Sequence, residues 1–269
     1  MKSVRVISVL AAAIAVAGPV SAVQATNWQG AYVGASAGFA STTWQGDLTK
    51  YPGGTTAAFD FPMGTYKSIN GGGLIAGGQI GFTKQSGDVV WGIEGDLSHV
   101  DADAFGVFAT KDFGPGNPSG ATKQVFYKHI QTNLDWLGTV RGRVGVLVNP
   151  DTLVYGTAGV AVGGTSSHQD VFFDGGVSGD PKLHASGDAS ATKWGWTVGA
   201  GVEKQLGNHW SVKAEYQVAD LGRIDYRYIG THTGYPYNNT PGSVHDTDGF
   251  SPELIVQVAR VGFNYRFGG

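Results

Sequence analysis

Apolar and polar residues take alternate positions along most of the chain, most regularly in its last twelve residues, 258–269. The apolar positions there are Val261, Phe263, Tyr265 and Phe267, and the polar positions include Arg260, Asn264 and Arg266. Successive side chains of a β-strand point to opposite faces. A period of two residues therefore predicts a closing strand with one apolar and one polar face.

Seven earlier stretches repeat this alternation. They lie at residues 28–40, 73–84, 88–98, 133–147, 152–164, 192–205 and 209–220. In the stretch at 133–147, the alternation places Leu134, Trp136 and Val140 on the apolar face and Arg141 and Arg143 on the polar face. With the closing segment, the pattern predicts eight strands.

The connections between these strands alternate in length. Short turn sequences rich in Gly, Asn, Asp and Pro join strands at 85–88, 149–151 and 206–209. Long connections without periodicity are expected at about 42–71, 102–131, 165–190 and 222–251. Up-and-down strands put every second connection at the same end. The sequence therefore predicts an all-β, eight-stranded antiparallel up-and-down barrel with short turns at one end and four long loops at the other.

Two barrels fit this pattern: a soluble lipocalin-like barrel with its apolar face inside, and a transmembrane barrel with its apolar face outside. The polar faces consist mostly of Gly, Ser and Thr with few charges, whereas a surface in water carries many more Lys and Glu. Tryptophans fall on the apolar faces, as in the aromatic girdles of membrane barrels. They are Trp91, Trp136, Trp194, Trp196 and Trp210. The transmembrane barrel is the favoured interpretation, with short periplasmic turns and extracellular loops.

Charged residues of both signs are expected in the lumen. They are Glu94, Asp96, Arg141, Arg143, Lys213, Glu215 and Arg260. The interior of an eight-stranded barrel is only just wide enough for side chains to fill it, and buried charges there need partners of opposite sign. The cluster could be a static plug or could gate a narrow pore, and the small bore favours the plug. On the closing strand, Phe263, Tyr265 and Phe267 are expected to anchor the periplasmic boundary.

The N-terminus and the composition add an export signal and exclude some partners. Lys2 and Arg5 precede an apolar run at 6–18, and cleavage is expected after Ala22 or Ala25. The predicted organisation is a signal peptide at 1–25 and a barrel domain at 26–269. The net charge of −3 gives no electrostatic reason to expect nucleic acid. With no cysteine in 269 residues, no disulfide holds the fold.

Candidate catalytic and ligand-binding groups are few. The chain has no cysteine, and no Ser, His and acid occur in a recognisable nucleophile context, because the one match to G-x-S-x-G, at 34–38, lies within an alternating stretch; no enzyme activity and no cofactor are predicted. Seven histidines fall mostly in expected loops or at strand ends, without the spacing of a metal site. They are His99, His129, His168, His184, His209, His232 and His245. The sequence DTDG at 246–249 lacks the further ligands of a calcium loop.

Several segments are similar to those of a known family. WQGAYVGASAGF (28–39), GGGLIAGGQIGF (71–82), LDWLGTVRGRVG (134–145), LVYGTAGVAVG (153–163) and the closing strand resemble the RopB-type family of outer-membrane β-barrel proteins. The resemblance implies a Gram-negative outer-membrane protein in contact with lipid and lipopolysaccharide. It also implies that the barrel-assembly machinery reads the closing strand. That strand normally ends in Phe, whereas here Gly268 and Gly269 follow Phe267.

The resemblance leaves more than one function open. The first is a structural, surface-exposed barrel with at most weak porin-like passage of small solutes. The second is a binding protein whose loops take up haemin or a host ligand. A soluble periplasmic carrier and an outer-membrane enzyme are further alternatives.

Overall fold

The computed structural model describes residues 27–45, 68–111, 125–174, 183–207, 209–224, 228–233, 242–246 and 252–267. The predicted signal peptide, with its cleavage site, lies outside these residues. No helix long and apolar enough to cross a membrane occurs in the described part of the chain.

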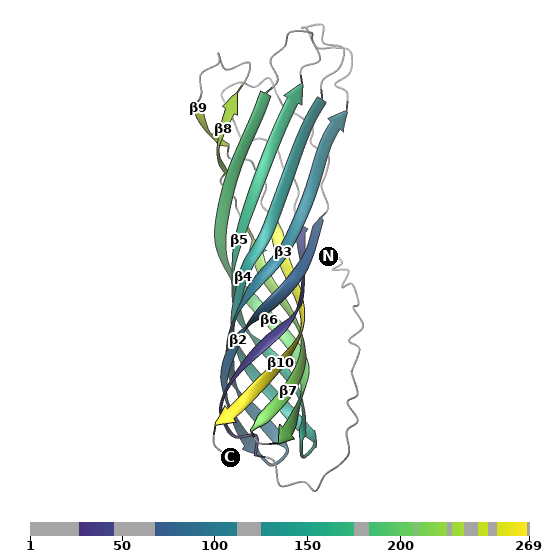
Figure 1. Ribbon diagram of the computed structural model, residues 1–269, viewed down its shortest axis with the longest axis vertical. Coiled ribbons are helices and arrows are strands. Elements are labelled where there is room, and N and C mark those ends of the chain that lie inside the picture. The colour runs from purple at the N-terminus through teal and green to yellow at the C-terminus, as the bar shows by residue number, and fades with distance from the viewer. Residues whose placement is uncertain are drawn as a thin grey trace, which may run out of the picture.

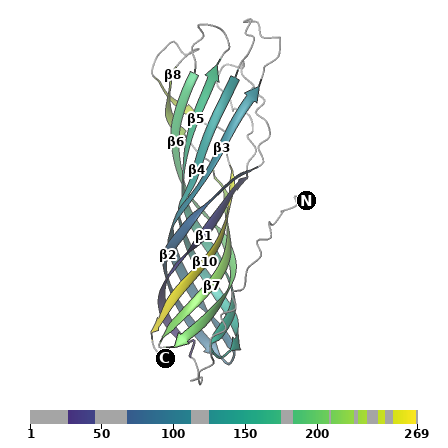
Figure 2. The same cartoon turned by 45° about the vertical axis from the view of Figure 1, so that its right-hand side comes forward.

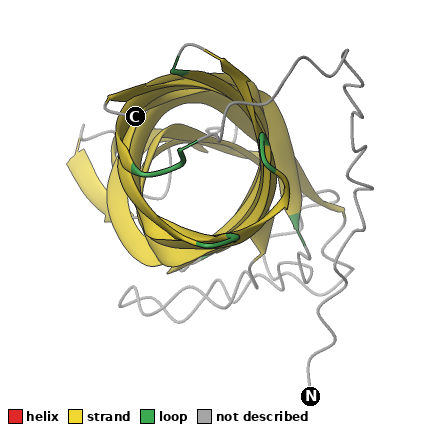
Figure 3. Cartoon of the chain, turned by 90° about the horizontal axis from the view of Figure 1, so that it is seen from below, coloured by secondary structure: helices red, strands yellow, loops and turns green. Residues whose placement is uncertain are grey.

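Ten strands make up the described structure, and eight of them close into a barrel (Figure 1). The strands are β1 (Gly30–Gln45), β2 (Ile69–Ser86), β3 (Val89–Lys111), β4 (Val125–Asn149), β5 (Thr152–Asp174), β6 (Leu183–Gly207), β7 (Trp210–Arg223), β8 (Tyr228–Thr233), β9 (Gly242–Asp246) and β10 (Glu253–Phe267). Strands β1 to β7 pair with their neighbours in chain order, and β10 pairs with both β7 and β1. All these pairings are antiparallel, and the ring is visible from below in Figure 3. The predicted fold class is confirmed.

Short turns connect the strands at one end of the barrel, as predicted. β2 and β3 are joined at Gly87 and Asp88, and β4 and β5 at Pro150 and Asp151. Gly87 has a φ of 59°, a left-handed conformation that glycine adopts without a steric penalty. His209, with a φ of 71°, lies directly before β7. These turns lie at the same end as the chain's last described strand residue (Figures 1 and 2).

Four strands are much taller than a membrane requires. β3, β4, β5 and β6 contain 23 to 25 residues each, whereas about 9–11 residues of a tilted strand cross a bilayer. Their upper halves rise above the other strands, and β8 and β9 add to β6 at the same end. The predicted loops at 102–131 and 165–190 were therefore wrong in extent, because most of their residues continue the strand ladders.

The apolar faces of the strands point outward, as the alternation predicts. On β3, Trp91, Ile93 and Leu97 are 50%, 54% and 62% exposed, whereas Glu94 between them is buried in the lumen. The same holds on β10, where Val261, Phe263 and Phe267 are outside. An exposed belt of large apolar side chains on every strand of the ring needs an apolar solvent, and the acyl chains of a bilayer supply it.

Leu134 is an exception to the predicted faces. It is fully buried inside the barrel, although the alternation places it with Trp136 on the outside. The register of β4 against β5 shifts between these two residues, so Asp135 is an extra residue in β4. A β-bulge of this kind moves every side chain beyond it to the opposite face.

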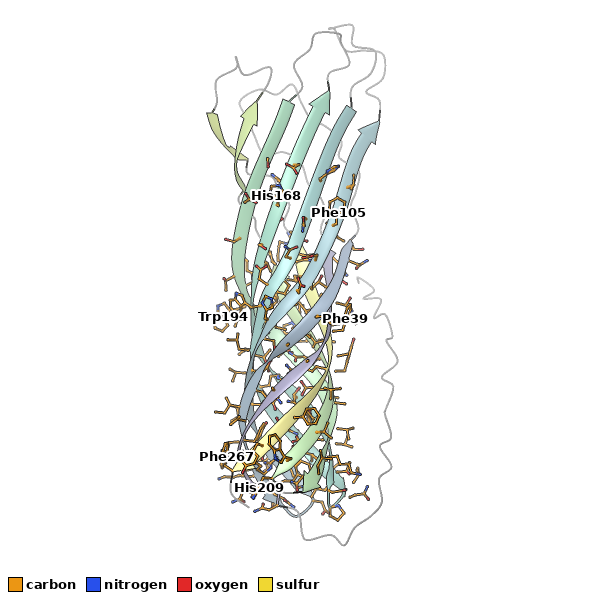
Figure 4. The ribbon with its side chains drawn as sticks, viewed as in Figure 1. Phe39, Phe105, His168, Trp194, His209 and Phe267 are labelled. Carbon is orange, nitrogen blue, oxygen red and sulfur yellow. The ribbon has the colours of Figure 1, made fainter. Side chains whose placement is uncertain are left out.

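Aromatic residues mark the two edges of the apolar belt. Tyr265 packs edge-on against Trp210 and Phe267 near the turn end, at ring-centroid distances of 5.1 and 5.2 Å. Phe39 and Trp194 lie at a common height further up the barrel (Figure 4). Tyr and Trp favour the two membrane–water interfaces, so these levels delimit the bilayer. Phe105 and His168 lie above it (Figure 4).

Candidate functional site: the lumen and the extracellular sheet

The lower lumen is filled by a network of ion pairs centred on Arg141. The guanidinium is fully buried and donates from Nη2 to Glu94 Oε1 at 2.6 Å and to Asp96 Oδ2 at 3.1 Å. Its Nη1 donates to Glu215 Oε1 at 2.8 Å. One cation thus joins carboxylates from β3 and β7 on opposite walls of the barrel.

The other predicted lumen residues complete the network. Lys213 Nζ lies 2.9 Å from both carboxylate oxygens of Glu94. Arg260 donates to Asp96 Oδ1 at 3.0 Å and to Glu215 Oε1 at 2.7 Å. Arg143 Nη1 lies 3.7 Å from Glu94 Oε2. The structure therefore brings all seven predicted lumen charges into one cluster.

Further members of the network come from residues that the sequence reading did not single out for the cluster. Glu203 accepts from Arg143 Nη2 at 2.5 Å and from Asn264 at 3.0 Å. The hydroxyl of Tyr32 donates to Glu94 Oε2 at 2.8 Å, and that of Tyr155 donates to Glu215 Oε2 at 3.0 Å. All of these residues lie on the polar faces of their strands, and this position in the alternation could have identified them as lumen residues from the sequence.

Glycines make room for the two inward tyrosines. A Cβ on Gly81 would lie 2.3 Å from the Tyr32 ring, and one on Gly201 would lie 2.6 Å from the Tyr155 ring. Each aromatic ring therefore lies directly over a glycine of the neighbouring strand. This arrangement explains part of the high glycine content, because the narrow bore holds either the ring or a second side chain, not both.

The upper lumen has the opposite character and is apolar. A single cluster of buried side chains fills it above the ion pairs. Its larger members are Trp44, Ile69, Ile75, Val100, Ile130, Leu134, Leu137, Leu221, Ile224, Leu254, Val256 and Val258. Their exposed fractions are all 3% or less. The expectation that the inward face carries mainly small and charged residues therefore holds only for the lower half.

The outer face of the extracellular sheet is mostly polar, with Phe105 and Val107 of β3 as exposed apolar residues on it. Above the level of Trp194, the outward residues of β3 to β6 include Asp103, Asn133, Ser166 and Ser190, which stand side by side across the four strands. One row higher, His168 Nδ1 lies 2.7 Å from Asp188 Oδ1, and Nε2 lies 3.4 Å from Asp170. The hydrogen bond to Asp188 raises the pKa of His168 above its ordinary value of 6.5, with the charge of Asp170 adding to the shift.

The histidines do not gather into a ligand set in the described part of the chain. No group of three or more His, Asp or Glu side chains there could hold a metal ion. The ring of His129 packs edge-on against Phe105 at a centroid distance of 6.0 Å, and the ring of His209 packs at a tilt against Tyr265 at 5.8 Å. Haemin or metal binding at the loops stays a prediction, because most of the loop residues lie outside the described ranges.

A closed ring of antiparallel strands, with an apolar exterior between two aromatic levels and a polar interior, defines a transmembrane β-barrel. The family described as "Outer membrane protein beta-barrel domain" matches residues 8–267, and the chain belongs to this family. The family confirms the resemblance drawn from the sequence motifs and places the protein in the outer membrane.

Relatives in the family are outer-membrane and immunogenic proteins. The chain is 30% identical over 246 residues to the 31 kDa outer-membrane immunogenic protein of Brucella melitensis biotype 1, covering 90% of this chain and 84% of that protein. It is 33% identical over 152 residues to the 22 kDa outer membrane protein of Rhizobium leguminosarum bv. viciae, covering 56% and 54%. The soluble periplasmic carrier is therefore excluded by both the family and the apolar exterior.

Solved structures of outer-membrane barrels show only distant likeness. OprG from Pseudomonas aeruginosa has 13% identity and a TM-score of 0.38, covering 90% of this chain and 97% of that structure. Ail from Yersinia pestis has 14% identity and a TM-score of 0.34, covering 89% and 99%.

Proposed function

We propose that the protein is a closed structural barrel that carries an extracellular β-sheet at the cell surface and conducts no solutes. The observation that carries this proposal is the filling of the lumen in two successive zones. A buried ion-pair network occupies the lower half, and buried apolar side chains occupy the upper half.

The two zones oppose the gate interpretation of the charged cluster. A gate needs a path that opens when an ion pair moves. Above Arg141, however, Leu134 and Leu137 are buried against residues from other walls of the barrel. Rearrangement of the charges would leave this apolar segment in place, and an ion pays a large desolvation cost to enter it.

Surface presentation rests on the height of β3 to β6. Their upper halves extend past the membrane and place polar side chains of the outer face outside the cell. The names of the relatives, which are outer-membrane immunogenic proteins, are consistent with a protein surface that is exposed outside the cell.

The barrel boundary suggests how the protein engages its membrane partners. We propose that Phe263, Tyr265 and Phe267 contact lipid at the periplasmic interface and form part of the strand presented to the barrel-assembly machinery. Phe263 and Phe267 are 54% and 52% exposed on the outer face of the last strand.

Conductance in planar bilayers tests the closed lumen. The native protein and the Arg141→Ala variant should both insert without stepwise currents, because the apolar zone is intact in each. A large water-filled porin in the same bilayer serves as the positive control. Reproducible conductance steps from the native protein would refute the proposal. Steps from Arg141→Ala alone would also refute it and would support the interpretation of the charged cluster as a gate.

A further inference from the structure

A polar groove runs along the outer face of β4, β5 and β6 above the membrane. Its upper part has a volume of about 590 Å³, and a lower part of about 260 Å³ continues from it through Ser190. The upper part is lined by Gln131, Asn133, Ser166, Ser167, His168, Asp188, Ala189 and Ser190. Asp135, Trp136, Gly164, Thr165, Ser190, Ala191 and Thr192 line the lower part.

Small residues in the middle and larger residues on the flanks create the groove. Ser166 of β5 pairs with Asn133 on one side and with Ser190 on the other. The bulge in β4 turns Asp135 outward, where its carboxylate accepts from Ser166 Oγ at 3.0 Å. The indole of Trp136 covers Gly164, where a Cβ would lie 2.1 Å from its Nε1. The bulge thus supplies both an acid and an aromatic wall.

We infer that this groove binds sugar units of a glycolipid in the outer leaflet. Amides, carboxylates and hydroxyls line one continuous surface, so a polyhydroxylated ligand finds both donors and acceptors there. Hydrogen bonds from sugar hydroxyls to an ionised carboxylate are stronger than those between neutral groups. Trp136 offers an aromatic face to the apolar side of a sugar ring.

Charge in the groove selects among sugars. Asp135 and Asp188 contribute carboxylates, and His168 is the only basic side chain among the lining residues. His168 is itself paired with Asp188. A phosphorylated sugar would meet like charge, so the groove suits neutral or amino sugars.

Position points to a membrane glycolipid as the source. Thr192 of the lower groove lies two residues from Trp194, which is 71% exposed at the upper aromatic level. Aromatic residues of a girdle mark the headgroup level of a bilayer. The groove therefore begins where acyl chains end and saccharide headgroups start.

Titration of dephosphorylated core oligosaccharide, prepared from rough lipopolysaccharide and free of lipid A, tests the site. Isothermal calorimetry on the native protein in detergent micelles should detect binding. Ser190→Trp fills the segment shared by both parts of the groove, so the indole occupies the space that the sugar needs. Binding should weaken at least about tenfold, which corresponds to a loss of about 1.4 kcal/mol in binding free energy.

Ser41→Trp is the matched control. Ser41 of β1 pairs with Gly72, and Gly72 pairs with Asp103 of the row that contains Ser190. Ser41 therefore lies in the same row of paired residues as Ser190 but away from the groove. It should bind as the native protein does. Heat-dependent gel mobility confirms that both variants fold. No binding by the native protein, or equal binding by Ser190→Trp, would overturn the inference, while bilayer conductance separately decides whether the lumen is closed.

Discussion

Replacing Arg141 with alanine should lower the free energy of unfolding by about 3–5 kcal/mol, the cost of breaking a buried ion pair by removing one partner. Arg141 contacts three carboxylates, and the exposed fractions of all four side chains are 2% or less. Lys213 and Arg260 would still neutralise part of the charge, but the carboxylates would lose their central donor. Urea titration of the micelle-folded protein, followed by tryptophan fluorescence, measures this change.

Lys204→Ala is the control for this loss. It also removes a cation from an ion pair, but Lys204 Nζ lies 3.7 Å from Asp151 at the periplasmic end, and the two side chains are 31% and 36% exposed. A pair in contact with water contributes about 0–1 kcal/mol. Equal destabilisation by the two variants would contradict the importance assigned to burial of the network.

Replacing Val140 with arginine should destabilise the barrel by about 2–4 kcal/mol, the cost of a cation on the lipid face near the middle of a bilayer. Val140 is 52% exposed on the outer face of β4, between Trp136 and Val144. Exposure to water would make the same change nearly neutral. Unfolding measured in lipid vesicles, where an acyl core is present, decides between the two environments.

Val107→Arg provides a control matched in residue, exposure and face. Val107 is 53% exposed on the outer face of β3, but it lies two residues beyond Phe105 in the extracellular half. Its replacement should change stability by less than about 0.5 kcal/mol, as surface changes usually do. A similar loss of stability at both positions would show that the membrane boundary assigned between Val140 and Val107 is wrong.

The sequence predicts the barrel and its faces because period-two alternation depends on local geometry alone. The faces of Trp91, Phe263 and Arg260 follow directly from their parity. Leu134 could not be placed, because the bulge at Asp135 is visible only in the pairing register of β4 with β3 and β5, and not in the alternation of the sequence.

The extracellular halves of β3 to β6 were read as loops for a related reason. Above the membrane the outer face turns polar while the inner face turns apolar, so the outward Asp103 and the inward Val100 reverse the pattern found lower on the same strand. A search for apolar outward residues therefore breaks off after Leu97, because His99, Asp101 and Asp103 take the next outward positions before Phe105 and Val107. In the lumen, the alternation identifies which charges point inward, but only the closed ring shows that Lys213 of β7 reaches Glu94 of β3 on the opposite wall.

Spin labels test the assignment of inside and outside most directly, because the chain has no native cysteine to interfere. Single cysteines at Val140, Val198 and Val107 would be labelled and reconstituted in vesicles. The account predicts that labels at Val140 and Val198 collide mainly with lipid-dissolved oxygen, whereas the label at Val107 collides with an aqueous nickel chelate. Free access of the chelate to Val140 and Val198 would contradict the lipid-facing exterior on which the account depends.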